Sequence, residues 1–290
     1  MAASSVSQGA AHVRVMRSNR FAVSLFLVVS VVAFALLGPV VIGREPGEIV
    51  GMPFEEPSRF ALLGTDNFGR DELTLLMYGA RTSLQIGAIA GILALLIGTV
   101  VGTVAGYYGD NTDETLMGLT NVFITIPSFV VLILLSIALR SRSVPVMGLV
   151  IGITSWPWTA RAVRAQACSL RAREHVDVAR LSGASGLSII ARDIVPYMFS
   201  YLAMAFTLQL SSAVLTEASL SMLGLGPTNT VSLGVMLQWS LLWEAVRQGN
   251  WWTFLPPTFL LAIIAFSLQL LNASLDEAYN PRLRRRGSAR

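Results

Sequence analysis

Six long apolar segments alternate with polar ones along this chain, and they constrain its fold more than any other feature. The first, residues 21–42, has 22 residues and no charged side chain. A helix rises about 1.5 Å per residue, so this segment can cross the roughly 30 Å hydrocarbon core of a bilayer. The others are residues 82–106, 116–139, 144–160, 197–223 and 254–275. The pattern predicts an all-α membrane protein with six transmembrane helices.

A signal peptide is the alternative for the first segment. It fits less well, because residues 21–42 exceed the usual length of about 7–15 apolar residues and no Ala-x-Ala site follows. Only 13% of the 290 residues are charged, whereas soluble domains average about 25%. The composition therefore also favours a membrane protein.

The sequence lacks the residues that several kinds of chemistry need. All 21 basic side chains are Arg, so a P-loop with its Lys is excluded. The single cysteine, Cys168, excludes an internal disulfide, and His12 and His175 are too few and too far apart for a metal cluster. No Ser nucleophile with a base and an orienting group is recognisable. We expect no catalytic, cofactor or metal site on this chain, and no nucleic-acid partner.

The placement of Arg predicts the orientation. With the N-terminus inside, the inner segments carry 14 Arg and the outer segments carry 7. The positive-inside rule then favours an N-in/C-in topology. The expected organisation is a cytoplasmic tail at 1–20, the first helix at 21–42, an extracytoplasmic loop at 43–81, a five-helix core at 82–275 and a cytoplasmic tail at 276–290. The core contains a cytoplasmic loop at 161–196.

Local features of the helices are also predictable. Small residues recur every three or four positions through 87–106, as Gly except for Ala94, and favour close helix packing over a pore wall. Pro127 is expected to kink the third helix. Residues 73–77 are expected to form an interfacial helix. Residues 227–253 are expected to form a loop whose tryptophans anchor at the membrane interface, with contact to a docking partner as the alternative.

The polar stretch Glu174–Pro196 lies between two apolar segments and is expected at the cytoplasmic surface. A short helix over 176–181 should end at Gly183, because Gly tolerates positive φ at a helix C-terminus. Small residues follow, which allow another backbone to approach. This shape is typical of a docking element.

The stretch resembles the "EAA" loop of membrane subunits of bacterial ABC importers. In that resemblance Asp177-Val178-Ala179 stands for Glu-Ala-Ala, Gly183 keeps the Gly position, and Asp193-Ile194-Val195-Pro196 closes the pattern. The departures are Asp for Glu, Val for the first Ala, and Asp193 and Val195 for Ile and Leu.

Further segments resemble the dipeptide/oligopeptide/nickel-type permeases of this class. They are Leu63-Gly-Thr-Asp-Asn-Phe-Gly-Arg-Asp71, Tyr78-Gly-Ala-Arg-Thr-Ser-Leu84 and Glu217-Ala-Ser-Leu-Ser-Met-Leu-Gly-Leu-Gly226. Met222 replaces the usual Phe. The resemblance covers nearly all of residues 60–281, and it implies the type I ABC importer permease fold in a multi-pass protein of the bacterial inner (plasma) membrane.

The resemblance also implies partners and site residues. The partners would be a second, homologous permease in a heterodimer, two cytoplasmic ATPases that bind ATP-Mg, an extracytoplasmic substrate-binding protein and the lipid bilayer. This chain would bind no cofactor and would not be an enzyme. The residues expected to couple to the ATPase are Glu174, Asp177, Ala179, Gly183, Ala184 and Ser185.

The fifth apolar segment supplies the candidate pathway residues. Gln209, Ser212 and Thr216 share a helical face, and Gln209 lies near the bilayer midplane. Glu217 is expected near the outer interface, where it bonds locally. Interhelical hydrogen bonding is the alternative for each polar residue.

The resemblance makes peptides the first expectation for the cargo, with nickel chelates, haem or another small solute as alternatives. A self-sufficient channel or secondary carrier is a more distant alternative, and a membrane-embedded enzyme is the remotest.

Overall fold

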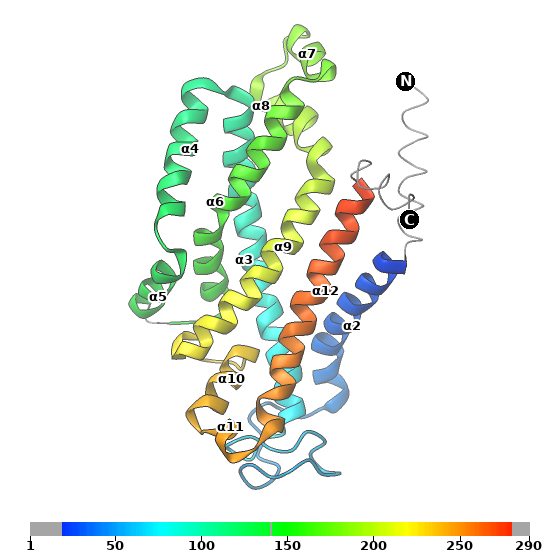
Figure 1. Cartoon of the computed structure of the whole chain (residues 1–290), viewed down its shortest axis with the longest axis vertical. Coiled ribbons are helices and arrows are strands. Elements are labelled where there is room, and N and C mark those ends of the chain that lie inside the picture. Colours follow the sequence, from blue (N-terminus) through cyan, green and yellow to red (C-terminus); the bar gives the residue numbers. More distant parts are fainter. Residues whose placement is uncertain (1–18, 140, 280–290) are drawn as a thin grey trace. The chain divides into compact units, whose positions relative to one another are not determined.

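The computed structural model describes residues 19–139 and 141–279, and most of them are helical (Figure 1). Within these ranges there is no β-strand, only isolated bridges between Ile49 and Arg70 and between Thr65 and Asp71. The described residues divide into two compact units. The first contains residues 19–85 and 214–279, and the second contains residues 86–213 except the undescribed residue 140. Most of the two predicted tails, including His12 and the C-terminal Arg cluster, lies outside the described residues.

The first unit is built on two packed helices, α2 (Asn19–Ile42) and α12 (Leu255–Tyr279). The first part of α3 (Glu72–Tyr108) packs near Gly38 of α2, where an added Cβ would lie 2.7 Å from the sulfur of Met77. Gly38 therefore permits a close approach of the two helices. Smaller elements complete the unit: η3 (Ser221–Leu225), α10 (Leu233–Leu242), α11 (Ala245–Gln248) and η4 (Trp251–Thr253).

The second unit contains the rest of α3 with α4 (Asp110–Thr125), α5 (Ser128–Ala138) and α6 (Val144–Arg171). Glycines of α3 face α6. A Cβ on Gly98 would lie 2.6 Å from Thr159, and one on Gly106 would lie 2.7 Å from the Cβ of Ala167. The predicted role of the glycine stripe in helix packing is confirmed.

The rest of the second unit runs from the cytoplasmic stretch predicted above into the fifth apolar segment. Its elements are α7 (Glu174–Leu181), α8 (Gly186–Ile189), the π-helical turn η1 (Ile190–Ile194), the 3₁₀ turn η2 (Pro196–Met198) and α9 (Phe199–Leu220). In η1 the amide of Val195 donates to the carbonyl of Ile190 at 2.9 Å, which is the wide hydrogen bond of a π turn.

Within residues 19–139 and 141–279, four helical stretches are long and apolar enough to cross a membrane, or five if the bent pair α4 and α5 counts as one span. That pair bends by 77° at the break that contains Pro127, so the predicted kink is confirmed. α6, the expected fourth span, is not among them. Its apolar first half runs into Thr154, Ser155 and then Arg161, which lower its hydropathy.

Two other local predictions were wrong. Residues 73–77 belong to the start of α3 and are not a separate interfacial helix. The expected loop at 227–253 contains α10, α11 and η4. In both places tertiary packing extends or adds helix beyond what the local sequence indicates.

Candidate functional site

The predicted docking stretch has a firmly packed base. Val176 of α7 is fully buried, and it packs in a core cluster with Ile189, Ile190 and Ile194. The same cluster includes residues of α3 and α6 (Tyr107, Val163, Ala167 and Leu170). His175 stacks on Tyr197 with ring centroids 4.5 Å apart, and its Nε2 lies 3.1 Å from the carbonyl oxygen of Asp193. These contacts fix α7 to the helices that carry it.

Gly183 ends α7 as predicted. Its φ is +78°, and no atom would meet a Cβ at this position, so the backbone conformation rather than crowding requires glycine. The amide of Ala184 donates to Ala179 at 3.1 Å and that of Gly183 donates to Arg180 at 3.0 Å. This pattern closes the helix with a left-handed residue. Ser185 then caps α8 by accepting from the amide of Ser188 at 3.4 Å.

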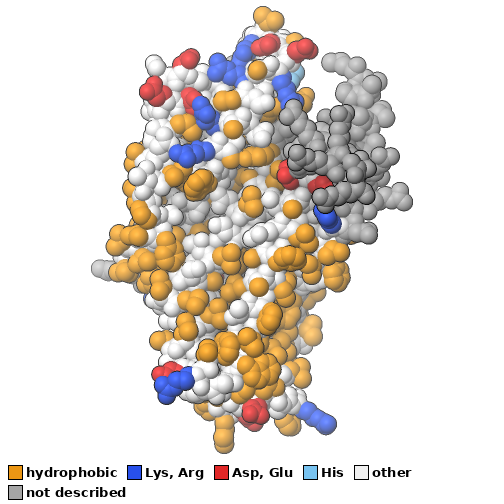
Figure 2. Space-filling view, viewed as in Figure 1, with side chains coloured by type: hydrophobic (Ala, Val, Ile, Leu, Met, Phe, Trp, Pro, Cys, Tyr) orange, Lys and Arg blue, Asp and Glu red, His pale blue; other side chains and the backbone are white. Residues whose placement is uncertain are grey.

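The tip of this segment exposes apolar side chains that the sequence analysis did not single out. Leu181 is 89% exposed, Leu187 is 68% exposed and Val178 is 62% exposed. In Figure 2 the end of the molecule that carries α7 shows apolar side chains among Arg, Asp and Glu. Three apolar residues in a polar loop were the signal that could have identified them. Such a surface suits contact with another protein.

The other predicted coupling residues divide between tip and base. Glu174 and Asp177 are exposed, and Asp177 pairs with Arg180 at 3.3 Å. Gly183, Ala184 and Ser185 are exposed at the turn. Ala179 is half-buried and packs against the core cluster, so it supports the base.

The four predicted pathway residues differ in their surroundings. In the second unit the Nε2 of Gln209 donates to the carbonyl of Ser155 at 3.1 Å and to the hydroxyl of Thr159 at 2.6 Å, which is the interhelical alternative. Ser212 is exposed on the same helix. In the first unit Thr216 is half-buried and Glu217 is fully buried. Glu217 is therefore enclosed within the first unit in this structure, and its place among the pathway residues stays a prediction.

Glu217 instead joins four segments of the first unit. Its carboxylate accepts hydrogen bonds from the hydroxyls of Ser83 at 2.8 Å and of Ser221 and Ser232 at 2.6 Å. The hydroxyl oxygen of Ser83 also accepts from the amide of Leu233 at 3.2 Å, and that of Ser232 caps α10 by accepting from Val235 at 3.2 Å. Local bonding of Glu217 was predicted, and its serine partners were not.

The segment Leu63–Asp71 is a folded cap. Asp66 accepts from the backbone amides of Phe68 and Arg70 and pairs with the Arg70 guanidinium at 2.5 Å. Gly69 has a φ of +79° and donates to the carbonyl of Asp66, so the predicted tight turn is confirmed. Asp71 caps α3 by accepting from the amide of Thr74 at 3.0 Å.

Two of the four tryptophans expected as membrane anchors serve this cap instead. The indole of Trp252 is buried and donates to the carbonyl of Thr65 at 3.1 Å. The guanidinium of Arg70 lies 4.3 Å from the ring centroid of Trp239. The anchor prediction was wrong for Trp252, because the cap supplies its indole with a polar partner inside the protein.

No group of three or more His, Cys, Asp and Glu side chains that could hold a metal ion occurs within residues 19–139 and 141–279. The described residues thus contain an exposed apolar tip at α7, a buried carboxylate junction at Glu217 and a hydrogen-bonded cap at Leu63–Asp71.

Comparisons with known proteins bring these features together. Residues 98–285 match the family model described as "Binding-protein-dependent transport system inner membrane component". A putative peptide transport system permease protein of Brucella abortus is 36% identical over 94% of this chain and 92% of its own length.

Two relatives from Bacillus subtilis are each 32% identical. The dipeptide transport system permease protein DppC is matched over 94% of this chain and 85% of its own length. The oligopeptide transport system permease protein OppC is matched over 93% and 88%, respectively.

A solved structure supports the fold. A chain of the MetNI methionine ABC transporter, in inward facing conformations, aligns with a TM-score of 0.53 at 19% identity. The alignment covers 69% of this chain and 96% of that chain. Members of the matched family are non-catalytic membrane components that act with an ATPase and a substrate-binding protein. The chain belongs to the family of binding-protein-dependent transport system inner membrane components, as a permease subunit of an ABC importer.

Proposed function

We propose that this permease carries peptides across the inner membrane, and that its α7 segment transmits the movement of an ATPase partner. Relatives that match more than nine-tenths of this chain are named as peptide, dipeptide and oligopeptide permeases, which supports peptides as the cargo. Ligands that co-purify with the cognate binding protein test this choice. Peptides are expected, whereas nickel chelates or haem alone would reassign the cargo.

The observation that carries the coupling role is a rigid base combined with an apolar tip. The base packs Val176 and Ile194 in a core cluster, while Leu181 and Val178 stay exposed. A partner that covers the tip gains apolar burial of about 25 cal/mol per Å². Because the base is fixed to α3 and α6, force on the tip is transmitted to those helices. The coupling residues of the proposal are Glu174, Asp177, Ala179, Gly183, Ala184 and Ser185.

Leu181→Asp tests this role in the assembled transporter. A charge at the centre of an apolar contact should reduce co-purification of the ATPase subunits and lower substrate-stimulated ATP hydrolysis at least tenfold. Leu62→Asp, also at an exposed leucine but in the segment 43–71, is the matched control and should leave ATPase co-purification unchanged. Normal co-purification and coupling of Leu181→Asp would contradict the docking role.

The assembly we propose contains a second, homologous permease, two ATPases that bind ATP-Mg and one binding protein. This chain contributes six spans in an N-in/C-in orientation, with the domain boundaries predicted from sequence. The pathway residues are Gln209, Ser212 and Thr216, and Ser212 lies with Leu208 on an exposed face of α9. The bent pair α4 and α5 forms the third span and α6 the fourth.

Cys168, the single cysteine, tests the orientation. It is an exposed residue near the cytoplasmic end of α6 in this topology. A membrane-impermeant maleimide should label it in inside-out vesicles and not in intact spheroplasts. Labelling only from the outside would invert the topology, and with it the docking proposal.

A further inference from the structure

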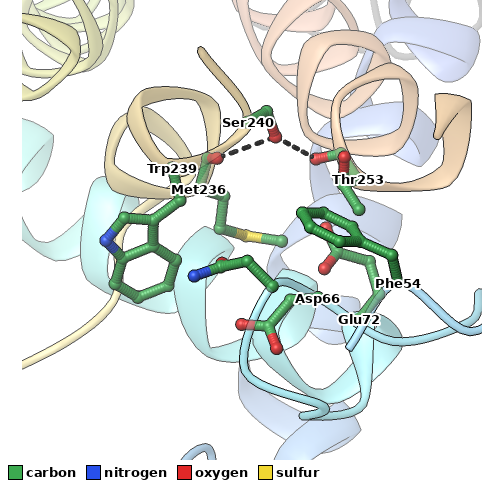
Figure 3. Close-up of a pocket in the computed structure, with 8 residues that line it drawn as sticks. Phe54, Asp66, Glu72, Met236, Trp239, Ser240 and Thr253 are labelled. Carbon is green, nitrogen blue, oxygen red and sulfur yellow. Dashed lines mark hydrogen bonds between the residues drawn. The ribbon is translucent and has the colours of Figure 1, made fainter. Parts of the chain in front are cut away.

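A small pocket lies under the cap of the first unit, and its polar lining is incomplete. It is lined by Phe54, Asp66, Asn67, Glu72, Met236, Trp239, Ser240 and Thr253 (Figure 3). The cavity volume is about 10 Å³. A volume of this size accommodates about one water molecule.

Glu72 places a carboxyl group in this pocket without a donor. The residue is 2% exposed and follows Asp71, which caps α3. Within the described ranges, no side chain or backbone amide donates a hydrogen bond to its carboxyl oxygens. A buried carboxyl group without a hydrogen-bond partner is strongly unfavourable.

Asn67 has a hydrogen-bond donor without an acceptor in the part of the chain that the structure describes. It is 9% exposed, and its Nδ2 is buried without an acceptor among the described residues. The pocket therefore has an unused donor from Asn67 and unused acceptors from Glu72. Phe54, Met236 and Trp239 supply the apolar part of the lining.

We propose that this pocket binds one ordered water molecule, which accepts a hydrogen bond from Asn67 Nδ2 and donates one to the carboxyl group of Glu72. Ser240 offers a third partner, because its hydroxyl donates toward the carbonyls of Met236 and Thr253 and leaves its own oxygen free to accept. Two to four partners are typical of buried water. The water would thus join the cap, α3 and α10 through one molecule.

Other occupants fit less well. A metal ion is held by several oxygen ligands, and no acidic cluster in the described part of the chain is arranged to hold one. A larger organic molecule exceeds the available space. The site also stands apart from the transport proposal, because neither Asn67 nor Glu72 belongs to the coupling or pathway residues.

A structure of the assembled transporter at a resolution that shows ordered water is the direct test. A single peak within hydrogen-bond distance of Asn67 Nδ2 and a Glu72 oxygen is expected. The proposal is overturned by no peak at that position in a map that shows other buried waters. A peak surrounded by five or more oxygen atoms at about 2.4 Å overturns it too, because that geometry indicates a cation.

Variants of the full transporter test the same link in solution. Asn67→Ala and Glu72→Met should each lower the apparent unfolding midpoint by roughly 4 °C. The double variant should lose less than the sum, because the first change already removes the shared water. Glu48→Met, at an exposed carboxyl group of the segment 43–71, is the matched control and should shift the midpoint by under about 1 °C.

Additive losses in the double variant would contradict a shared water. Replacing sodium and potassium by choline should leave the wild-type midpoint unchanged, and a clear decrease would indicate a bound cation instead. If a variant fails to insert into the membrane, the peak in the wild-type map still decides the question.

Discussion

Two polar segments of the chain, the cap and the segment around α7, are built in opposite ways. The cap around Leu63–Asp71 turns its polar groups inward, where Asp66 pairs with Arg70 and Thr65 accepts from Trp252. The segment around α7 packs its base but leaves Leu181 and Leu187 exposed at its tip. The first arrangement stabilises the protein by itself, whereas the second is completed by contact with another protein. Changes in the cap region should therefore affect stability, and changes at the tip should affect coupling.

The largest expected effect on stability comes from the junction beside the cap. Glu217→Ala removes the acceptor for three serine hydroxyls and should lower the free energy of unfolding by about 3 kcal/mol. Glu217→Gln keeps one oxygen acceptor and should lose less. Thermal unfolding of the purified permease measures both. Equal stability of Glu217→Ala and the wild type would contradict a structural role for this carboxylate.

A smaller effect is expected at the turn that ends α7. Gly183→Val places a β-branched residue at a φ of +78°, which costs about 1–2 kcal/mol locally. ATP hydrolysis stimulated by substrate should fall severalfold while membrane insertion is retained. Gly183→Asn is the matched control, because Asn tolerates this conformation, and it should retain most of the coupling. Equal coupling in both variants and the wild type would contradict a role for a rigid turn at Gly183.

The smallest expected effect lies in the cap itself. Trp252→Phe removes the donor to the carbonyl of Thr65 and should lower the free energy of unfolding by about 1 kcal/mol. Trp243→Phe, at an exposed indole, should change it by less than about 0.5 kcal/mol. Neither substitution should alter ATPase co-purification. Loss of ATPase co-purification in Trp252→Phe would contradict the separate roles of the cap in stability and the tip in coupling.

Local patterns predicted much of this protein. Apolar length predicted α2, α3, α9 and α12, and the small residues of α3 predicted its packing against α6. The positive φ of Gly183 followed from helix-ending chemistry. Each of these depends on residues close in sequence, where periodicity and backbone preference act directly.

Long-range partners could not be predicted in this way. Ser83 and Glu217 are separated by 134 positions, and nothing in either segment alone indicates that they meet. The same holds for Trp252 and Thr65, which are 187 positions apart. Tryptophans near an apolar segment are typical of interfacial anchors. The position of Trp252 is instead determined by its hydrogen bond to Thr65. The exposed tip could have been predicted from sequence, because Val178, Leu181 and Leu187 are apolar residues in a polar stretch.

The wide turn η1 has a consequence for mapping contacts along this part of the chain. The π turn η1 winds the chain more loosely than an α-helix, and the 3₁₀ turn η2 that follows winds it more tightly. A helical wheel drawn from α8 straight into α9 ignores both turns, so it cannot be used to assign the faces of Gln209 and Ser212. Cross-linking pairs for α9 should therefore be chosen on a helical wheel that starts at Phe199.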